Sequence, residues 1–241
     1  MENSTAILVH IWYEDVFLDK IYPRIVQHNG SVDFYFNFVK SNISSTCVET
    51  IQKSFNNYKI TYSENPGRDI RGYMNMLSEI YKEDKNYKNY IFLHTKTNID
   101  SFGVACLETL LLSTVGTVKT LQTVQNILEE SQEYGMVGSA TMFASGFYTE
   151  GERSKSLNIA DRLGIQKDKV NFIAGTMFAV KAEIIDKFLR KPGVIERFCK
   201  DFVEDGIKHS GWHHAWERVF GMLVYDCGQK ILPYDRSTQE R

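Results

Sequence analysis

The sequence is poor in cysteine and proline and carries no excess of charge of one sign. Its 241 residues include four cysteines and four prolines, and the formal net charge is −2. This balance argues against nucleic acid or an anionic membrane surface as a partner. The cysteines lack the paired spacing of a zinc site or a disulfide framework, which favours a reduced, cytoplasmic compartment. They are Cys47, Cys106, Cys199 and Cys227.

Long apolar runs are also missing. No stretch approaches the roughly 20 apolar residues that a membrane-spanning helix needs. The N-terminus does not show a basic segment followed by a long apolar one, so neither a transmembrane segment nor a secretory signal is expected. Hydrophobic residues nevertheless make up 43% of the sequence, which is enough to bury a sizeable core. We therefore expect a single domain over residues 1–241.

The first hundred residues contain an alternation of strand and helix patterns. Apolar runs and period-two alternation predict strands over residues 6–12, 32–39, 59–63 and 90–93. Between them we expect a helix capped by Asp15 and stopped by Gly30, a helix over 45–55 and a helix from Ile70. Pro23 should kink the first helix or mark a second start. The alternation is typical of an α/β fold with a mostly parallel sheet flanked by helices.

The second half of the sequence alternates less regularly. A helical pattern over 104–132 is broken near Gly116, and a short strand is predicted over 136–139. Residues 140–169 include a charged run and are expected to form a long loop. The remaining patterns predict a strand over 171–180 interrupted by Gly175, helices from Ala182 and from Val194, and a final helix and strand within 211–232.

Polar clusters lie at the ends of three predicted strands. In open α/β sheets, ligands collect at the carboxyl ends of the strands. We therefore expect one crevice lined by His10, Asn65, Arg68, His94 and Lys96. For His10, a hydrogen-bonded place in the core remains the alternative, since a lone histidine in an apolar strand is more often a core residue than a ligand.

Four blocks of the sequence occur in the same order in a known family. They are Glu64-Asn65-Pro66-Gly67-Arg68-Asp69, His94-Thr95-Lys96, Ala174-Gly175-Thr176-Met177-Phe178 and His214-Ala215-x-Glu217-Arg218-x-Phe220-Gly221. With these blocks the chain resembles the rhamnan synthesis protein F family over about residues 6–232. The resemblance implies a glycosyltransferase of the GT-A fold that acts in the assembly of rhamnose-containing and other surface polysaccharides. Pro66, where the family more often has Arg, and region 140–169 depart from the family pattern and bear on the choice of acceptor.

The resemblance also implies what each part of the chain binds. Residues 1–100 would form the nucleotide-binding half and residues 101–241 the acceptor and catalytic half, with a nucleotide-sugar donor and a glycan acceptor as partners. The residues expected to bind the nucleotide sugar are His10, Asn65, Gly67, Arg68, Asp69, His94 and Lys96. The residues expected near the acceptor or just behind the site are Gly175, Thr176, His213, His214 and Arg218.

The block His94-Thr95-Lys96 departs from the GT-A pattern in its charge. Many GT-A enzymes have Asp-x-Asp at this place, where the carboxylates hold a divalent cation against the donor pyrophosphate. Hard cations prefer oxygen ligands, whereas an ammonium neutralises phosphate directly. We therefore expect Lys96 to replace the metal, so that no cofactor is required. Two alternatives stay open: Lys96 is a solvated residue at a strand end, or His213 or His214 rebuilds a metal site with Asp226.

Arg68 and Asp69 allow two interpretations. Arg68 can fork onto a phosphate while Asp69 accepts a hydrogen bond from a ribose or sugar hydroxyl. Alternatively, Asp69 caps the following helix and Arg68 pairs with Glu64. Trp12 and Tyr13, just after the first strand, can stack on a nucleotide base or serve as ordinary packing residues.

Glu217 is the candidate catalytic base, because GT-A enzymes that invert configuration often carry a carboxylate in the final helix. Such a base takes a proton from the attacking hydroxyl. The alternative is that Glu217 forms a buried pair with an arginine or caps a neighbouring loop. The predicted function is transfer of a sugar, rhamnose or another deoxyhexose, from a nucleotide-sugar donor to a glycan acceptor in polysaccharide or glycoprotein glycan assembly. The alternatives are a non-catalytic carbohydrate-binding or scaffolding module and a sugar nucleotidyltransferase.

Overall fold

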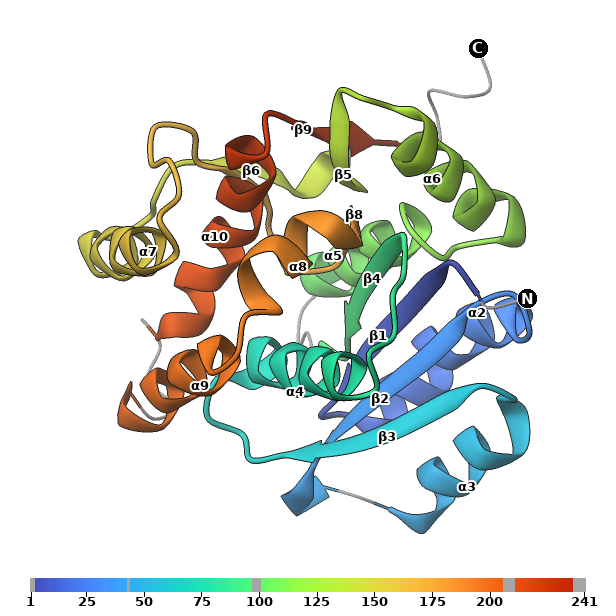
Figure 1. The fold of residues 1–241 in the computed structure, drawn as a ribbon. Coiled ribbons are helices and arrows are strands. Elements are labelled where there is room, and N and C mark those ends of the chain that lie inside the picture. The colour runs from blue at the N-terminus through green and yellow to red at the C-terminus, as the bar shows by residue number, and fades with distance from the viewer. Residues whose placement is uncertain (1–2, 43, 97–100, 206–210, 236–241) are drawn as a thin grey trace.

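The fold is built on a seven-stranded sheet (Figure 1). In the computed structural model the described residues are 3–42, 44–96, 101–205 and 211–235. The strands of this sheet are β1 (Thr5–Ile11), β2 (Asp33–Val39), β3 (Tyr58–Ser63), β4 (Asn89–His94), β5 (Tyr134–Ser139), β8 (Phe178–Lys181) and β9 (Lys230–Tyr234). Their order is β3-β2-β1-β4-β8-β5-β9, and β8 alone runs antiparallel to its neighbours. The predicted α/β fold with a mostly parallel sheet is therefore confirmed.

The first four strands lie within a residue or two of the predicted bounds. β1 lies between β2 and β4, and all of its residues are buried, as expected for a strand with a nearly continuous apolar run. Phe34, Phe36 and Phe38 alternate in β2 with Tyr35 and Asn37, so the two sets lie on opposite faces of the sheet. The predicted alternation of strand and helix is therefore present in this half of the chain.

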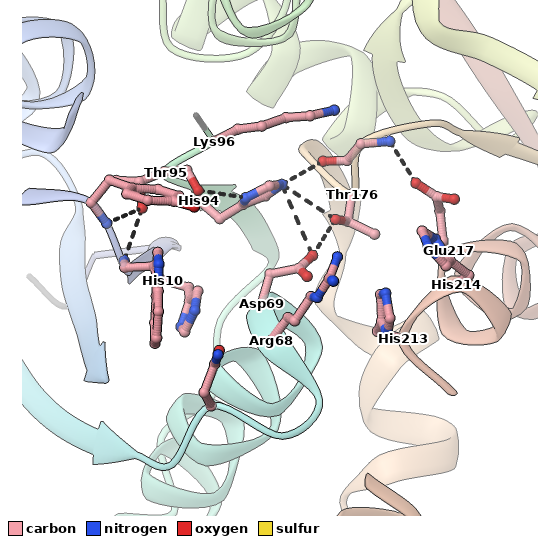
Figure 2. Close-up of a pocket in the computed structure, with 14 residues that line it drawn as sticks. His10, Arg68, Asp69, His94, Thr95, Lys96, Thr176, His213, His214 and Glu217 are labelled. Atoms are coloured by element: carbon pink, nitrogen blue, oxygen red, sulfur yellow. Dashed lines mark hydrogen bonds and ion pairs between the residues drawn. The ribbon is translucent and has the colours of Figure 1, made fainter. Parts of the chain in front are cut away.

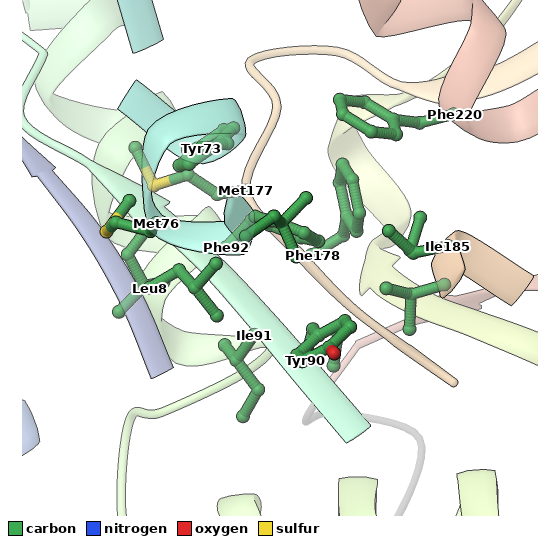
Figure 3. Packing of buried hydrophobic residues seen from close by; sticks show 14 of the residues in the cluster. Leu8, Tyr73, Met76, Tyr90, Ile91, Phe92, Met177, Phe178, Ile185 and Phe220 are labelled. Atoms are coloured by element: carbon green, nitrogen blue, oxygen red, sulfur yellow. The ribbon is translucent and has the colours of Figure 1, made fainter. Parts of the chain in front are cut away.

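One face of the sheet is covered by helices from both halves of the chain. They are α4 (Arg68–Lys82), α8 (Ala182–Leu189) and α10 (Trp212–Asp226), and α9 (Val194–Asp205) packs against α4 and α10. Phe92 of β4 forms the centre of this packing. Its ring lies 4.8 Å from Tyr73 of α4, 5.2 Å from Phe178 of β8 and 5.7 Å from Phe220 of α10, measured between centroids (Figure 3). This contact fixes α4 and α10 against the same part of the sheet.

The other face carries the remaining helices of the first half together with α5 and α6. Residues 14–28 form α1 (Glu14–Val16), the π-helix η1 (Phe17–Ile21), α2 (Tyr22–Ile25) and the 3-10 helix η2 (Val26–His28). Of the two expectations for Pro23, a second start is the one present, because α2 begins at Tyr22 with Pro23 in its first turn. The others are η3 (Lys40–Asn42), α3 (Ser45–Ser54), α5 (Ser101–Leu112) and α6 (Val118–Glu130). None of the helices, as far as the chain is described, is both long and apolar enough to cross a membrane.

The expected long loop over residues 140–169 is wrong, because most of it is ordered into secondary structure. It holds the 3-10 helix η4 (Ala140–Met142), the strand β6 (Phe143–Ser145) and the helix α7 (Glu150–Leu163). Thr149 caps α7, since its side chain accepts a hydrogen bond from the backbone N of Glu152 at 3.1 Å. The exposed face of this helix is strongly charged, and only a narrow face, including Ile159 and Ala160, is buried. Such a pattern gives a weak helical periodicity, which is why the sequence did not indicate it.

The predicted strand over residues 171–180 is two strands in different sheets. β7 (Asn171–Ile173) pairs with β6 in a two-stranded ribbon, whereas β8 belongs to the central sheet. The chain turns between them at Gly175 and Thr176, where φ is +91° and +49°. Gly175 therefore does interrupt the extended pattern, but the break separates two sheets.

The turn between β7 and β8 lies at the edge of the sheet where the parallel strands end. Because β8 runs antiparallel to β4, its amino end meets the carboxyl end of β4, with Phe178 beside Phe92. The ends of β1 and β4, the start of α4, the start of α10 and this turn therefore come together. This edge is the place that the sequence predicted for the site.

Candidate functional site

A cavity of about 460 Å³ opens at this edge of the sheet (Figure 2). It is lined by His10, Trp12, Tyr13, Asn65, Arg68, Asp69, His94, Thr95, Lys96, Gly175, Thr176, His213, His214 and Glu217. The five residues that were expected to share one crevice are all among them. Two predicted site residues, Gly67 and Arg218, lie outside the lining. Of the lining residues, Trp12 and Tyr13 were expected only as candidate stacking partners of a base, and Thr95 was not predicted.

Gly67 shapes the backbone that leads into α4. Its φ is +89°, and a Cβ at this position would lie 2.6 Å from the ring of Phe202. The backbone N of Arg68 donates to the carbonyl of Asn65 at 2.8 Å, closing the turn. Gly67 thus lets the chain turn so that Arg68 and Asp69 enter the first turn of α4 at the cavity.

The structural alternatives for Arg68 and Asp69 are both wrong. Glu64, the expected partner of Arg68, pairs with Lys40 at 3.0 Å. Asp69 does not cap the helix, because α4 already begins at Arg68 with Gly67 as its N-cap. Instead, the Asp69 carboxylate accepts a hydrogen bond from the hydroxyl of Thr176, across the cavity from its own helix.

Asp69 and His94 form the centre of the cavity wall. His94 Nε2 donates to the carbonyl of Gly175 at 2.7 Å and lies 3.9 Å from Asp69 Oδ2. Burial raises the pKa of Asp69, but the charge of His94, the hydrogen bond from Thr176 and the charges of His10 and His213 outweigh burial, so the pKa lies below its usual value. Asp69 is therefore a carboxylate that is ready to accept hydrogen bonds from a ligand.

His10 is both a buried, hydrogen-bonded residue and part of the cavity lining. Its Nδ1 lies 3.0 Å from Asn37 Oδ1, which also accepts from the hydroxyl of Ser63 at 2.8 Å. The Asn37 amide nitrogen donates to Thr61 Oγ1 at 2.9 Å, so Oδ1 is the acceptor and Nδ1 of His10 is the donor. Burial lowers the pKa of His10 to about 4, against the opposing effects of Asp69 and Asn37. The imidazole is therefore neutral at pH 7, and its Nε2 is an acceptor.

Thr95 ties the ends of β1 and β4 together. Its hydroxyl oxygen accepts from the backbone N of Trp12 at 2.8 Å and of Tyr13 at 3.0 Å. Its own backbone N donates to the carbonyl of His10 at 3.0 Å. Thr95 thereby sets where the two aromatic residues leave β1. The sequence signal for this role is limited to the place of Thr95 between His94 and Lys96.

Arg68 and Lys96 bring positive charge to the cavity. Neither side chain lies within ion-pair distance of a carboxylate in the described parts of the chain, although both line a cavity that contains two carboxylates. Lys96 extends across the cavity towards the turn at Gly175, where an added Cβ would lie 3.9 Å from its Nζ (Figure 2). These two cations are available to an anionic ligand.

Glu217 lies opposite the sheet, on α10, with a side chain that is 12% exposed. Its Oε1 accepts from the backbone N of Gly175 at 2.6 Å, and its Oε2 accepts from Arg218 Nη1 at 2.6 Å. Burial raises the pKa of Glu217, more than the Gly175 hydrogen bond and the charges of Arg218 and Lys96 lower it. Both expected alternatives, a buried pair with an arginine and a cap on a neighbouring loop, are therefore also present, and Glu217 combines them with a place in the cavity.

The histidines of α10 do not form a metal site with Asp226. His213 and Asp226 lie near opposite ends of α10, about 20 Å apart at 1.5 Å per residue. Asp226 instead accepts from the backbone N of Gln166 at 3.0 Å and from Lys187 at 3.2 Å. In the part of the chain that is described, no three His, Cys, Asp or Glu residues are grouped so that they could hold a metal ion. The described residues therefore do not fit a divalent cation held by an Asp-x-Asp pair. That donor binding needs no metal stays a prediction.

Comparison with known proteins places the chain in a family. Core-mannan synthase A of Aspergillus fumigatus, solved in an Mn/GDP form, is similar to this chain with a TM-score of 0.47 and 9% sequence identity, over 95% of this chain and 72% of that one. Among curated proteins there is no significant match. The family described as Rhamnan synthesis protein F matches residues 1–229. Because this match covers nearly the whole sequence, the chain belongs to the rhamnan synthesis protein F family.

Proposed function

We propose that this protein is a glycosyltransferase that moves a sugar from a nucleotide-sugar donor to a glycan acceptor. Membership in the rhamnan synthesis protein F family supports a glycosyltransferase, and rhamnose or another deoxyhexose as the sugar is our inference from the family's name. The observation that carries the proposal is the cavity itself, where the cations Arg68 and Lys96 face the same space as the buried carboxylate of Glu217. A transferase of this kind needs positive charge at the leaving phosphate and a base at the attacking hydroxyl.

The sheet side of the cavity is the proposed donor site. Arg68 and Lys96 neutralise the donor pyrophosphate, and the aromatic faces of Trp12 and Tyr13 stack on the base. Asp69 accepts from a ribose or sugar hydroxyl, because its low pKa keeps it ionised. Asn65, His10 and His94 supply further polar contacts to the donor. In this proposal Lys96 takes the place of a metal ion, in keeping with a GT-A-like enzyme that requires no cofactor.

Glu217 acts as the base in the proposed reaction. Its carboxylate takes the proton from the acceptor hydroxyl as that oxygen bonds to the anomeric carbon of the donor sugar. The bond between the anomeric carbon and the phosphate oxygen breaks, and the nucleoside diphosphate leaves with the bonding electrons. The charge that develops on the leaving phosphate is stabilised by Arg68 and Lys96. His213, His214 and the turn at Gly175 and Thr176 border the side from which the acceptor enters.

A donor screen tests this function. Purified protein is incubated with single nucleotide sugars, and thermal stability and release of nucleoside diphosphate are measured, because a ligand that binds only the folded state raises the melting temperature. We expect one donor to stabilise the protein and to be hydrolysed slowly without acceptor. Stabilisation by glycans with no hydrolysis of any donor would instead identify a carbohydrate-binding or scaffolding module. Formation of a nucleotide sugar from a sugar 1-phosphate and a nucleoside triphosphate would identify a nucleotidyltransferase.

A chelator separates the two modes of phosphate binding. Because Lys96 supplies the charge, we expect EDTA to leave donor hydrolysis unchanged. Loss of turnover with EDTA and recovery with Mn²⁺ would contradict the proposal for Lys96 while leaving the transferase function in place. A cytoplasmic location and a single-domain organisation remain predictions from the sequence.

A further inference from the structure

Behind Glu217, a buried guanidinium is shared by two carboxylates. Arg218 is 1% exposed in its side chain, and its Nη1 lies 2.6 Å from Glu217 Oε2. On the other side, its Nη2 lies 3.3 Å from Oε2 of Glu152, which is 9% exposed and belongs to α7. Glu152 is outside the cavity lining and was not a predicted site residue. It comes from the helix in the region where the sequence predicted a loop.

The guanidinium of Arg218 is held in one orientation. Its central carbon lies 4.7 Å from the ring centroid of Tyr148 and 4.3 Å from that of Phe172. Its Nη1 also donates to the carbonyl of His214 at 2.9 Å. Stacking against rings and bonding in the plane together restrict a planar group strongly. The position of Glu217 Oε2 therefore depends on Arg218. Glu152 is the second carboxylate paired with this guanidinium, at Nη2, an atom that makes no hydrogen bond among the described residues.

We propose that Glu152 is a positioning residue for Glu217, acting through Arg218. This inference rests on the proposed function, in which Glu217 is the catalytic base. Glu152 keeps the guanidinium in place and takes up part of its charge, so that Glu217 is oriented without being fully neutralised by its partner. The ribbon of β6 and β7 and the helix α7 thus contribute to the reaction although they supply no group to the cavity wall near the donor.

The charges around Glu217 determine what the loss of Glu152 should do. Glu217 faces the N–H of Gly175, the cations Arg218 and Lys96, and the carboxylate of Asp69. Neutralising Glu152 leaves the whole charge of Arg218 to Glu217, which favours the ionised form of Glu217. The pKa of Glu217 then falls, and a reaction that needs Glu217 ionised keeps its rate to lower pH. The weaker base also reacts more slowly on the plateau.

The substitution Glu152→Gln suits this test because it preserves the local hydrogen bonding. The backbone N of Tyr148 donates to Glu152 Oε2 at 3.0 Å, and the carbonyl oxygen of a glutamine can accept the same bond. A matched control lies two residues earlier on α7. Glu150 is 80% exposed and pairs with Arg153 on the surface at 3.4 Å, so Glu150→Gln makes the same chemical change away from Arg218.

The first measurement follows the carboxyl group of Glu217 directly. The protein is labelled with ¹³C at the glutamate side-chain carboxyl, and the Glu217 signal is assigned by its loss in Glu217→Gln. We expect Glu152→Gln to lower the titration midpoint of Glu217, Glu150→Gln to leave it unchanged, and Glu152→Asp, which keeps the charge, to stay nearer the unsubstituted protein. A Glu217 midpoint that is the same in Glu152→Gln as in Glu150→Gln would overturn the proposal.

The second measurement is the pH profile of transfer with the donor found in the screen. In Glu152→Gln we expect kcat to fall by about 10- to 100-fold with the donor KM unchanged, since small displacements of a catalytic group have effects of this size. The acid limb of kcat should move to lower pH. The titration of Glu217 needs no donor, so a shifted midpoint in a protein that transfers no sugar would refute the transferase function alone. A normal kcat and an unmoved acid limb in Glu152→Gln would refute the positioning role alone.

Discussion

The substitution Glu217→Gln tests the assignment of the base most directly. The carboxylate accepts one hydrogen bond on each oxygen, from Gly175 and from Arg218. A glutamine has one acceptor oxygen and an amide that only donates, so one of these two donors loses its partner. An unsatisfied buried donor costs about 1–3 kcal/mol. In a domain of this size the melting temperature should fall by roughly 2–12 °C.

The expected effect on the reaction is much larger than the effect on stability. A positioned general base contributes about 10²–10⁴-fold, so kcat of Glu217→Gln should fall by at least about a hundredfold. Donor affinity should be unchanged, because the proposed donor contacts lie on the sheet side of the cavity. The raised pKa of Glu217 also predicts the direction of the pH dependence. In the unsubstituted protein, transfer should be lost as the pH falls through the pKa of Glu217, which lies above that of an ordinary glutamate.

Three assays together decide this prediction: initial rates of transfer, donor binding by calorimetry, and thermal unfolding followed by circular dichroism. The surface variant Glu150→Gln serves as the control and should match the unsubstituted protein in all three. Full activity of Glu217→Gln would remove Glu217 from the reaction. Loss of the folded state together with donor binding would make Glu217 a structural residue.

The remaining predictions concern the donor site and its support. Lys96→Met should weaken donor binding by roughly 10- to 150-fold in calorimetry, the equivalent of about 1.5–3 kcal/mol for a charged hydrogen bond; unchanged affinity would make Lys96 a solvated strand-end residue. Gly67→Ala should lower the free energy of unfolding in urea by more than Gly164→Ala, because both have positive φ but only Gly67 would press a Cβ against Phe202, at 2.6 Å; equal losses would show that the ring moves aside. His10 binds a proton more weakly in the folded protein than in the unfolded chain, so the free energy of unfolding should fall by up to about 3 kcal/mol as the pH drops from about 6.5 to 4. The same dependence of unfolding free energy on pH in His10→Gln would contradict this.

The sequence was sufficient to predict the edge of the sheet and most residues that gather there. The carboxyl ends of neighbouring parallel strands meet at one edge of a sheet, so the positions of His10 and His94 at or near the carboxyl ends of buried strands predicted that they lie close together. The start of α4 was equally readable, because Pro66 and Gly67 end one element just before a helical pattern begins.

Other parts of the site depend on contacts between distant segments, which no local pattern records. Glu152 and Arg218 meet because α7 packs along α10, and α7 itself was hidden by its charged surface. The antiparallel direction of β8 was not evident either, since a strand of four residues carries no signal of its direction. The hydrogen bond from Thr176 to Asp69 follows from that direction and was invisible for the same reason.

The turn between β7 and β8 has a consequence for how this protein can vary in length. It joins a strand of the two-stranded ribbon to a strand of the central sheet, so both of its ends are fixed by separate ladders of hydrogen bonds. Within it, Gly175 bonds to Glu217 through its N–H and to His94 through its carbonyl, and Thr176 bonds to Asp69. One inserted or deleted residue would break contacts to three elements at once, whereas at Gly146 the backbone N bonds to the carbonyl of Val170 at 2.7 Å and an added Cβ would meet no atom within 4 Å. Natural and engineered insertions should therefore be accepted near Gly146 and rejected between β7 and β8.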